Sequence, residues 1–280
     1  MFKWITRHQG EFLIPKFTVN TPAIQNALAT VRHISKNYPP PYEIFASGGV
    51  DSQAVIYAWI ASGKAFNVNC CVFNDQLNHH DYTTLIRLSE ILNFDIVFHE
   101  LDVLKFLSDE YPDYAETYKC GSPHVCAHMK MSEFVNNGTV IFSGDPGFGG
   151  QPYTPDANRM GLYRYAQQTG RDFVPFFFLE TPEIAWGMGG INHANESKAN
   201  KYQNRNFIVI EPESKFTGFE KVKDLYDSKY SHLVTDYDRN TRLSWQSSNR
   251  TFDLLLRNKY EFKYHSESTA VFRYTKDFQC

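Results

Sequence analysis

The chain has 280 residues, which is enough for one or two domains with a substantial buried core. Hydrophobic residues make up 42% of it and charged residues 21%, a balance typical of a globular protein and not of a disordered one. The formal net charge of -3 argues against a protein that coats nucleic acid, because neutralising phosphates requires an excess of Lys and Arg.

The cysteines favour a reducing compartment. Their number is odd and their spacing is not that of a secreted disulfide framework; they are Cys70, Cys71, Cys120, Cys126 and Cys280. The first residues lack the sustained apolar segment of a signal peptide, and no stretch approaches the ~20 apolar residues of a membrane span. We therefore expect a cytoplasmic protein with reduced thiols and no membrane partner.

In chain order, the first predicted element is a helix over residues 24–34, where apolar residues recur at helical spacing. Three prolines, at positions 39 to 41, then close a first segment. After them, short apolar runs suited to buried strands alternate with helical patterns. Strands are predicted over 42–47, 68–73, 95–101 and 139–143, and helices over 52–62, 82–92 and within 122–135.

This alternation predicts an α/β fold, in which a mostly parallel sheet is covered by helices on both faces as a three-layer sandwich. Ligands bind such sheets beyond the carboxyl ends of the strands. After residue 150 the alternation fades, and helices are expected over 158–168, 219–230 and 250–258. We expect an N-terminal extension (1–40), a core (41–150) and a helix-leaning C-terminal region (151–280) that shapes a substrate pocket.

A glycine-containing loop is predicted between the first strand and the helix that follows. Two glycines let the backbone turn and bring its N–H groups against an anion, and we expect a positive φ at Gly49. The positive N-terminus of the next helix adds to this, so the loop suits a pyrophosphate group. The loop residues, all expected to contact a nucleotide, are Ala46, Ser47, Gly48, Gly49, Val50, Asp51 and Ser52.

Three side chains could complete such a site. The hydroxyls of Ser47 and Ser52 could donate to phosphate oxygens, and Asp51 could hold the Mg²⁺ that accompanies ATP. No lysine follows the glycines, so this is not a P-loop of the G-x-x-x-x-G-K-[ST] type. The alternative is an ordinary turn in which Asp51 or Ser52 caps the next helix.

In this strand-to-helix context, residues 47–52 (SGGVDS) resemble the SGGxDS signature of the PP-loop, or N-type, ATP pyrophosphatases. That superfamily includes asparagine, GMP and NAD synthetases, tRNA-thiolating and lysidine-forming enzymes, and sulfonucleotide reductases. The resemblance implies an adenine nucleotide alpha hydrolase-like fold for residues 41–150. It also implies main-chain contacts to adenine near Phe73, at the end of the second strand. An equal alternative is that Asn74 and Asp75 only start a turn before the next helix.

The reaction that the resemblance implies begins with attack of a substrate oxygen on the α-phosphorus of ATP. Pyrophosphate leaves, and an amine or sulfur nucleophile then displaces AMP. The amidotransferases of the asparagine-synthetase branch carry an N-terminal glutaminase domain with a cysteine directly after the initiator methionine. This chain has Phe2 there, so we expect nitrogen to come from ammonia, a substrate amine or another protein.

A second glycine-rich segment, residues 142–150 (FSGDPGFGG), resembles the second motif of that branch. The resemblance implies a nucleotide contact at Gly144 and a catalytic or metal-organising carboxylate at Asp145, acting with Asp51. The additional Asp-Glu pair usual in the family is missing, so Asp51 and Asp145 would be the carboxylates left to hold Mg²⁺. The alternative is a glycine-rich surface turn with a solvated Asp145.

Two further segments carry weaker signals. The residue types of Cys120, His124, Cys126 and His128 suit zinc, but their spacing favours a buried thiol and pocket-facing or surface histidines. Residues 239–264 interleave basic and aromatic side chains, which can hold a single-stranded nucleic acid, although a solvated helix face is favoured.

The leading hypothesis is therefore an ATP-dependent ligase or amidotransferase-like enzyme, with ATP and Mg²⁺ as cofactors and a small-molecule acceptor. One alternative is a PP-loop enzyme that modifies a nucleobase or tRNA by sulfur or amine transfer. Another is a nucleotide-binding protein without catalysis, motivated by the missing Asp-Glu pair. The sequence does not predict the oligomeric state.

Overall fold

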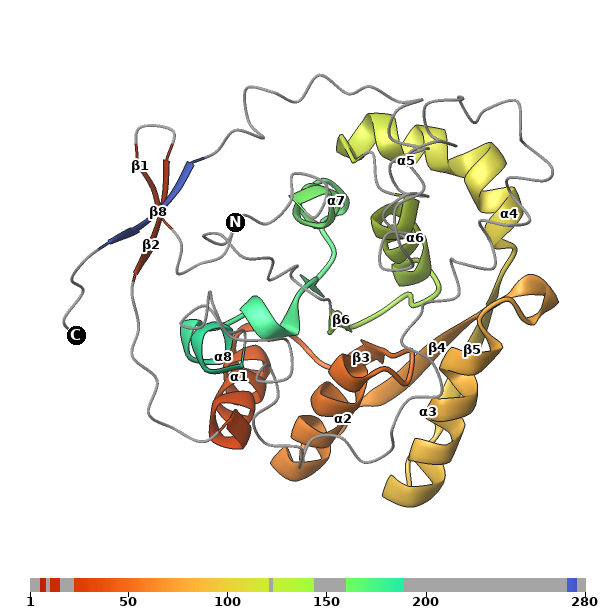
Figure 1. Cartoon of the computed structure of the whole chain (residues 1–280), viewed down its shortest axis with the longest axis horizontal. Helices are drawn as coiled ribbons and strands as arrows, with labels where there is room; N and C mark the ends of the chain where they lie inside the picture. The colour runs from red at the N-terminus through yellow and green to blue at the C-terminus, as the bar shows by residue number, and fades with distance from the viewer. Residues whose placement is uncertain are drawn as a thin grey trace, which may run out of the picture.

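The computed structural model describes residues 6–8, 11–15, 23–120, 123–143, 160–188 and 271–275. Its centre is a five-stranded sheet with the strand order β5-β4-β3-β6-β7, in which every neighbouring pair is parallel (Figure 1). The strands are β3 (Tyr42–Phe45), β4 (Asn67–Phe73), β5 (Ile96–Leu101), β6 (Thr139–Phe142) and β7 (Phe173–Val174).

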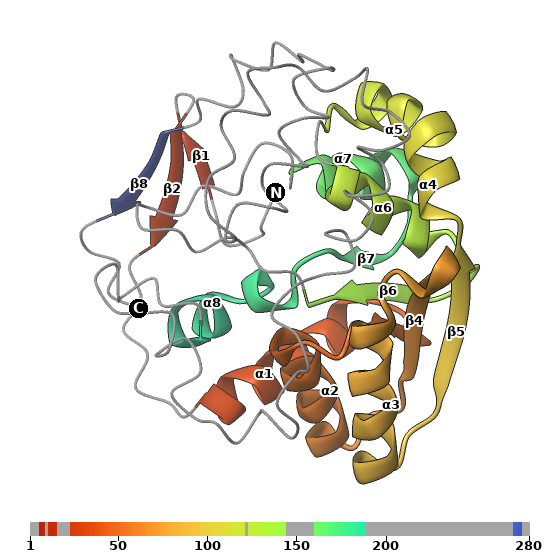
Figure 2. The ribbon, with the colours of Figure 1, turned by 45° about the vertical axis from the view of Figure 1, so that its right-hand side comes forward.

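Helices cover both faces of this sheet, as Figure 2 shows. One face packs against α1 (Ala23–Asn37), α2 (Val50–Ser62), α3 (His79–Leu92) and α8 (Pro182–Met188). The other packs against α5 (Tyr111–Tyr118), α6 (Pro123–Ser132) and α7 (Met160–Thr169). Short helical turns join them: η1 (Asn74–Gln76), α4 (Val103–Lys105), η2 (Phe106–Glu110) and η3 (Phe177–Leu179).

The alternation of side chains along each strand divides the core in two. Ile44 faces the α2 side, where it joins Trp59 in one buried cluster. Phe45, the next residue, faces the α6 side and joins Phe142 in the other. All four residues of β3 are buried because this strand lies at the centre of the sheet with helices on both faces. The predicted α/β fold with a parallel sheet covered on both faces is therefore confirmed.

The predicted elements that fall on described residues are present, including α7 at the expected helix over 158–168. The stretch from α4 to α5 was not predicted as helix. It begins where Asp102 accepts a hydrogen bond from the Lys105 N–H (3.0 Å), and it buries Phe106 and Tyr111. The strand β7 and the helix α8 were also not predicted. The helices expected over 219–230 and 250–258 lie outside the described residues.

A second, three-stranded sheet joins segments from both ends of the chain. Strand β1 (Thr6–His8) pairs antiparallel with β2 (Glu11–Pro15), and β2 pairs parallel with β8 (Val271–Thr275). Within the part of the chain that the structure describes, no helix is both long enough and apolar enough to cross a membrane.

Candidate functional site

The strand order places a topological switch point between β3 and β6. From β3 the chain passes through α2 to β4 on one face, whereas β6 is reached from α6 on the other face. In open parallel sheets, ligands bind in the crevice that such a reversal leaves outside the carboxyl ends of the strands. The loop predicted to bind phosphate follows β3 directly, so it lies at this point of the sheet.

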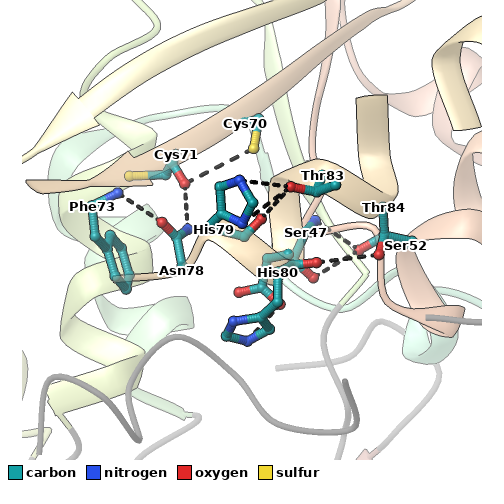
Figure 3. A network of polar contacts seen from close by, with 11 residues as sticks. Ser47, Ser52, Cys70, Cys71, Phe73, Asn78, His79, His80, Thr83 and Thr84 are labelled. Atoms are coloured by element: carbon teal, nitrogen blue, oxygen red, sulfur yellow. Dashed lines mark hydrogen bonds and ion pairs between the residues drawn. The ribbon is translucent and has the colours of Figure 1, made fainter. Parts of the chain in front are cut away.

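Hydrogen bonds from both sides fix the conformation of the loop. The Ala46 N–H donates to the Asn69 carbonyl of β4 at 2.9 Å, and the Ser47 N–H donates to Ser52 Oγ at 3.2 Å. Ser52 is only 4% exposed, and its oxygen also lies 3.5 Å from Ser47 Oγ (Figure 3). Ser52 therefore ties the start of α2 back to Ser47 and holds the loop in this conformation. Of the two serines, it is Ser47 that is exposed to solvent.

The two glycines of the loop have different environments. Gly48 has a φ of +75°, and a Cβ there would lie 2.6 Å from the Asp81 carbonyl oxygen and 2.8 Å from the Leu85 nitrogen of α3. Gly49 has a φ of -63° and a ψ of 163°, which any residue can adopt, so the expectation of a positive φ at Gly49 was wrong. Among the residues that the structure describes, a Cβ at Gly49 would meet only Ser47 Oγ, at 3.6 Å.

Gly48 thus lets α3 pack against the loop, while no described residue crowds the space beside Gly49. That space adjoins the first turn of α2, for which Gly49 is the N-cap. Because Gly49 occupies the N-cap position, Asp51 and Ser52 lie within α2 and neither is its N-cap residue. The first N–H groups of a helix have no acceptor within it and carry a partial positive charge, which suits an anion. Asp51 lies in this first turn and is partly exposed.

Next to the loop, the end of β4 is held by one side chain. Asn78 Oδ1 accepts a hydrogen bond from the Phe73 N–H at 2.9 Å, and Asn78 Nδ2 donates to the Cys71 carbonyl at 2.8 Å (Figure 3). The Phe73 ring is buried in the α6-side core, so any contact of Phe73 with a nucleotide would involve its main chain. Sequence reasoning missed Asn78, because an Asn directly before a helix is typical of a cap.

Between β4 and α3 the backbone adopts an unusual conformation. Asp75 and Gln76 are consecutive, exposed and both at a φ of +55°. Such left-handed conformations of residues other than glycine cost of order 1–3 kcal/mol each and cluster at functional sites. Asn74 Oδ1 accepts the Val103 N–H at 3.2 Å, which ties this turn to the segment after β5. The turn follows the carboxyl end of β4, on the same edge of the sheet as the loop.

The first turn of α3 also reaches this edge, because Gly48 packs against Asp81. His80 Nε2 lies 3.6 Å from Asp81 Oδ1, and the His80 side chain is 15% exposed. The site therefore brings together the predicted loop, the end of β4 near Phe73 and the N-termini of two helices. The expected Gly144 and Asp145 follow β6 but lie outside the described residues, as does the basic segment 239–264.

The thiols of the described cysteines are buried. Cys120 and Cys126 are fully buried, and Cys126 Sγ donates to the Cys120 carbonyl at 3.3 Å. Burial raises the pKa of Cys70 to about 12 and raises that of Cys71 as well. Among the described residues, no group of three or more His, Cys, Asp or Glu side chains could hold a metal ion, so the zinc alternative gains no support.

No protein-family model matches the chain, and neither does any curated protein sequence. Solved structures do show similarity. NMN synthetase from Francisella tularensis is 15% identical over 91% of this chain and 98% of its own, with a TM-score of 0.29. U34-tRNA thiolase NcsA from Methanococcus maripaludis, with its 4Fe–4S cluster, is 12% identical over 84% of this chain and 80% of its own, with a TM-score of 0.32.

A third similar structure is the glutamine-dependent NAD+ synthetase from Acinetobacter baumannii in complex with adenosine diphosphate. It is 11% identical over 89% of this chain and 47% of its own, with a TM-score of 0.34. At these identities and TM-scores the likeness assigns neither a ligand nor a reaction to this chain. The case for a nucleotide site therefore depends on the loop, its place in the sheet and the signature it carries.

Proposed function

We propose that this protein binds ATP with Mg²⁺ at residues 46–52 and cleaves it to AMP and pyrophosphate while activating a second, small-molecule substrate. The observation that carries the proposal is the space beside Gly49, which no described residue crowds. It lies at the first turn of α2, at the switch point of a parallel sheet, in a loop with the SGGxDS signature.

The loop offers hydrogen-bond donors to the pyrophosphate that leaves in this reaction. Backbone N–H groups at the first turn of α2 can donate to phosphate oxygens, and the exposed Ser47 hydroxyl can donate to another such oxygen. Donors that stabilise charge developing on pyrophosphate favour attack at the α-phosphorus. A substrate oxygen would form a bond to that phosphorus as pyrophosphate leaves. An amine or ammonia would then displace AMP.

Asp51 is the described carboxylate best placed for Mg²⁺, because it is partly exposed and lies in the turn that faces the phosphate space. Its oxygens are ligands that this hard cation prefers. Asp145 would supply a second carboxylate after β6, with Gly144 as a nucleotide contact. Bound Mg²⁺ would neutralise phosphate charge and thereby favour departure of pyrophosphate.

The reaction class that we propose is an AMP-forming ligase similar to the asparagine-synthetase branch. To test it, the protein is incubated with Mg²⁺ and with ATP labelled separately at the α and γ positions, in a pool of cell metabolites, and the products are resolved. We expect labelled AMP and labelled pyrophosphate, and loss of both in Asp51→Asn. Release of ADP and phosphate that depends on Asp51 would contradict the proposal, whereas binding without turnover in any pool would favour a catalytically silent protein.

A further inference from the structure

The histidines of α6 are not accounted for by the nucleotide site. His124 and His128 are four residues apart on this helix, so they share one face of it. Their ring centroids lie 4.5 Å apart with an angle of 57° between the planes. Both side chains are partly exposed, whereas Cys126 between them is fully buried. The C-x3-H-x-C-x-H segment therefore places its thiols in the core and brings its two imidazoles together.

Ring contacts connect this pair to the strand that enters the loop. The His128 ring packs on Phe142 with a centroid distance of 4.8 Å, and Phe142 stacks on Phe45 at 5.1 Å. Phe142 is the last residue of β6, and Phe45 is the last residue of β3, directly before Ala46. The imidazole pair therefore lies at the carboxyl edge of the sheet, next to the switch point.

The pair approaches that edge from the face opposite to α2. The phosphate loop continues into α2 on one face, whereas α6 belongs to the core on the other face. The phosphate loop and the imidazole pair thus reach the carboxyl edge of the sheet at the neighbouring strands β3 and β6, from opposite faces. A nucleotide whose phosphates lie in the loop would leave the second substrate on the side of the imidazoles.

We infer that His124 and His128 lie beside the second substrate in this site and that one of them takes up the proton released by the attacking amine. This inference rests on the proposed function. As the amine nitrogen bonds to the activated carbon, the bond from that carbon to the AMP oxygen breaks and its electron pair leaves with AMP. The proton lost by the nitrogen passes to a neutral imidazole nitrogen.

The chemistry and the placement of the two rings suit this role. Histidine is the side chain most often used for positioned proton transfer, and the two imidazoles lie in contact at a centroid distance of 4.5 Å. Positioned acids and bases of this kind contribute typically ~10²–10⁴-fold to a rate.

The first experiment follows the imidazole signals of the full-length protein, labelled with ¹³C-histidine, by NMR during titration with Mg²⁺ and α,β-methylene-ATP. Single His→Gln variants assign the signals. His33 is the internal control, because it lies near the C-terminal end of α1, which leads into the amino end of β3. We expect the His124 and His128 signals to shift on binding and the His33 signal to stay.

The outcomes separate this inference from the proposed function. If calorimetry shows that the analogue does not bind, the proposed function fails and the inference fails with it. If the analogue binds but the His124 and His128 signals move no more than that of His33, the inference alone is overturned.

The second experiment measures AMP release from ATP in the metabolite pool. His128→Gln, and the double variant with His124→Gln, should lower the rate by ~10²-fold or more and leave the dissociation constant of the analogue nearly unchanged. His33→Gln is the matched control and should match wild type in both measurements. Wild-type AMP release by the double variant would overturn the proton-transfer role, as would an equal loss of rate in His33→Gln.

Discussion

At the scale of single residues, the two adjacent glycines of the loop have separate tasks. Gly48 has a left-handed backbone and lies against the backbone of α3, whereas Gly49 is extended and no described residue crowds it. The sequence predicted a strand, a Gly-Gly turn and a helix in the right places. It could not predict which glycine is left-handed, because that depends on how α3, some thirty residues later, packs against the loop.

We predict effects of different size on stability when alanine replaces each of these glycines. Gly48→Ala should lower the free energy of unfolding by about 2 kcal/mol or more, because it adds a left-handed alanine and a clash with the α3 backbone. Gly49→Ala should change it by less than ~1 kcal/mol, since its backbone is allowed and no described residue crowds a Cβ there. Urea denaturation of both variants measures this difference. Equal stability of Gly48→Ala and wild type would contradict the packing described for the loop.

At the scale of elements, one side chain joins the end of β4 to the start of α3. Asn78 is buried and bonds the main chain at both Phe73 and Cys71. We predict that Asn78→Ala lowers the free energy of unfolding by about 2–4 kcal/mol, because it leaves two buried backbone groups without these partners. Thr83→Ala, on the exposed face of α3, is the control and should cost less than ~1 kcal/mol. Thermal unfolding of both variants measures the two losses of stability. If Asn78→Ala lowers the free energy of unfolding no more than Thr83→Ala does, Asn78 does not hold this junction.

The predicted elements are determined mainly by their own sequence, whereas the missed elements depend on contacts with other segments or mix two helix types. The core strands are short, largely apolar runs separated by stretches long enough for a helix, and these elements appear where the sequence places them. Strand β7 is two residues long and is a strand only through its pairing with β6. The stretch from α4 to α5 changes from α to π and back to α helix, so its apolar spacing follows no single period.

At the scale of the whole molecule, the core encloses the thiols of every described cysteine: Cys70, Cys71, Cys120 and Cys126. We predict that iodoacetamide at pH 8 leaves all four unmodified in the folded protein and labels them in urea. Alkylation requires the thiolate, and burial raises the pKa of Cys70 to about 12. Peptide mass spectrometry identifies which cysteines are alkylated. Rapid labelling of any of the four under native conditions would contradict the burial described.

The same thiols predict how stability depends on pH. A thiol whose pKa is higher in the folded than in the unfolded state stabilises the fold fully below its unfolded value, ~8.5, and loses that contribution as pH rises toward the folded value. For Cys70 the folded pKa is about 12, so the urea midpoint should fall as pH rises from 9 toward 12. Cys70→Ala should show a shallower decline than wild type. If the urea midpoint falls equally with pH in Cys70→Ala and in the wild type, titration of Cys70 does not cause the decline.

Calorimetric titration with ATP and Mg²⁺ measures whether residues 46–52 bind the phosphates of ATP, as we propose. Bound ligand should also raise the unfolding free energy, by ~2.7 kcal/mol at a hundredfold excess over Kd. The matched variant is Gly49→Val, because its backbone conformation is open to valine while its side chain would fill the space beside the first turn of α2. We predict binding at millimolar ATP or below by the wild type and none by the folded variant. No binding by the wild type, or equal affinity of the two proteins, would contradict the account.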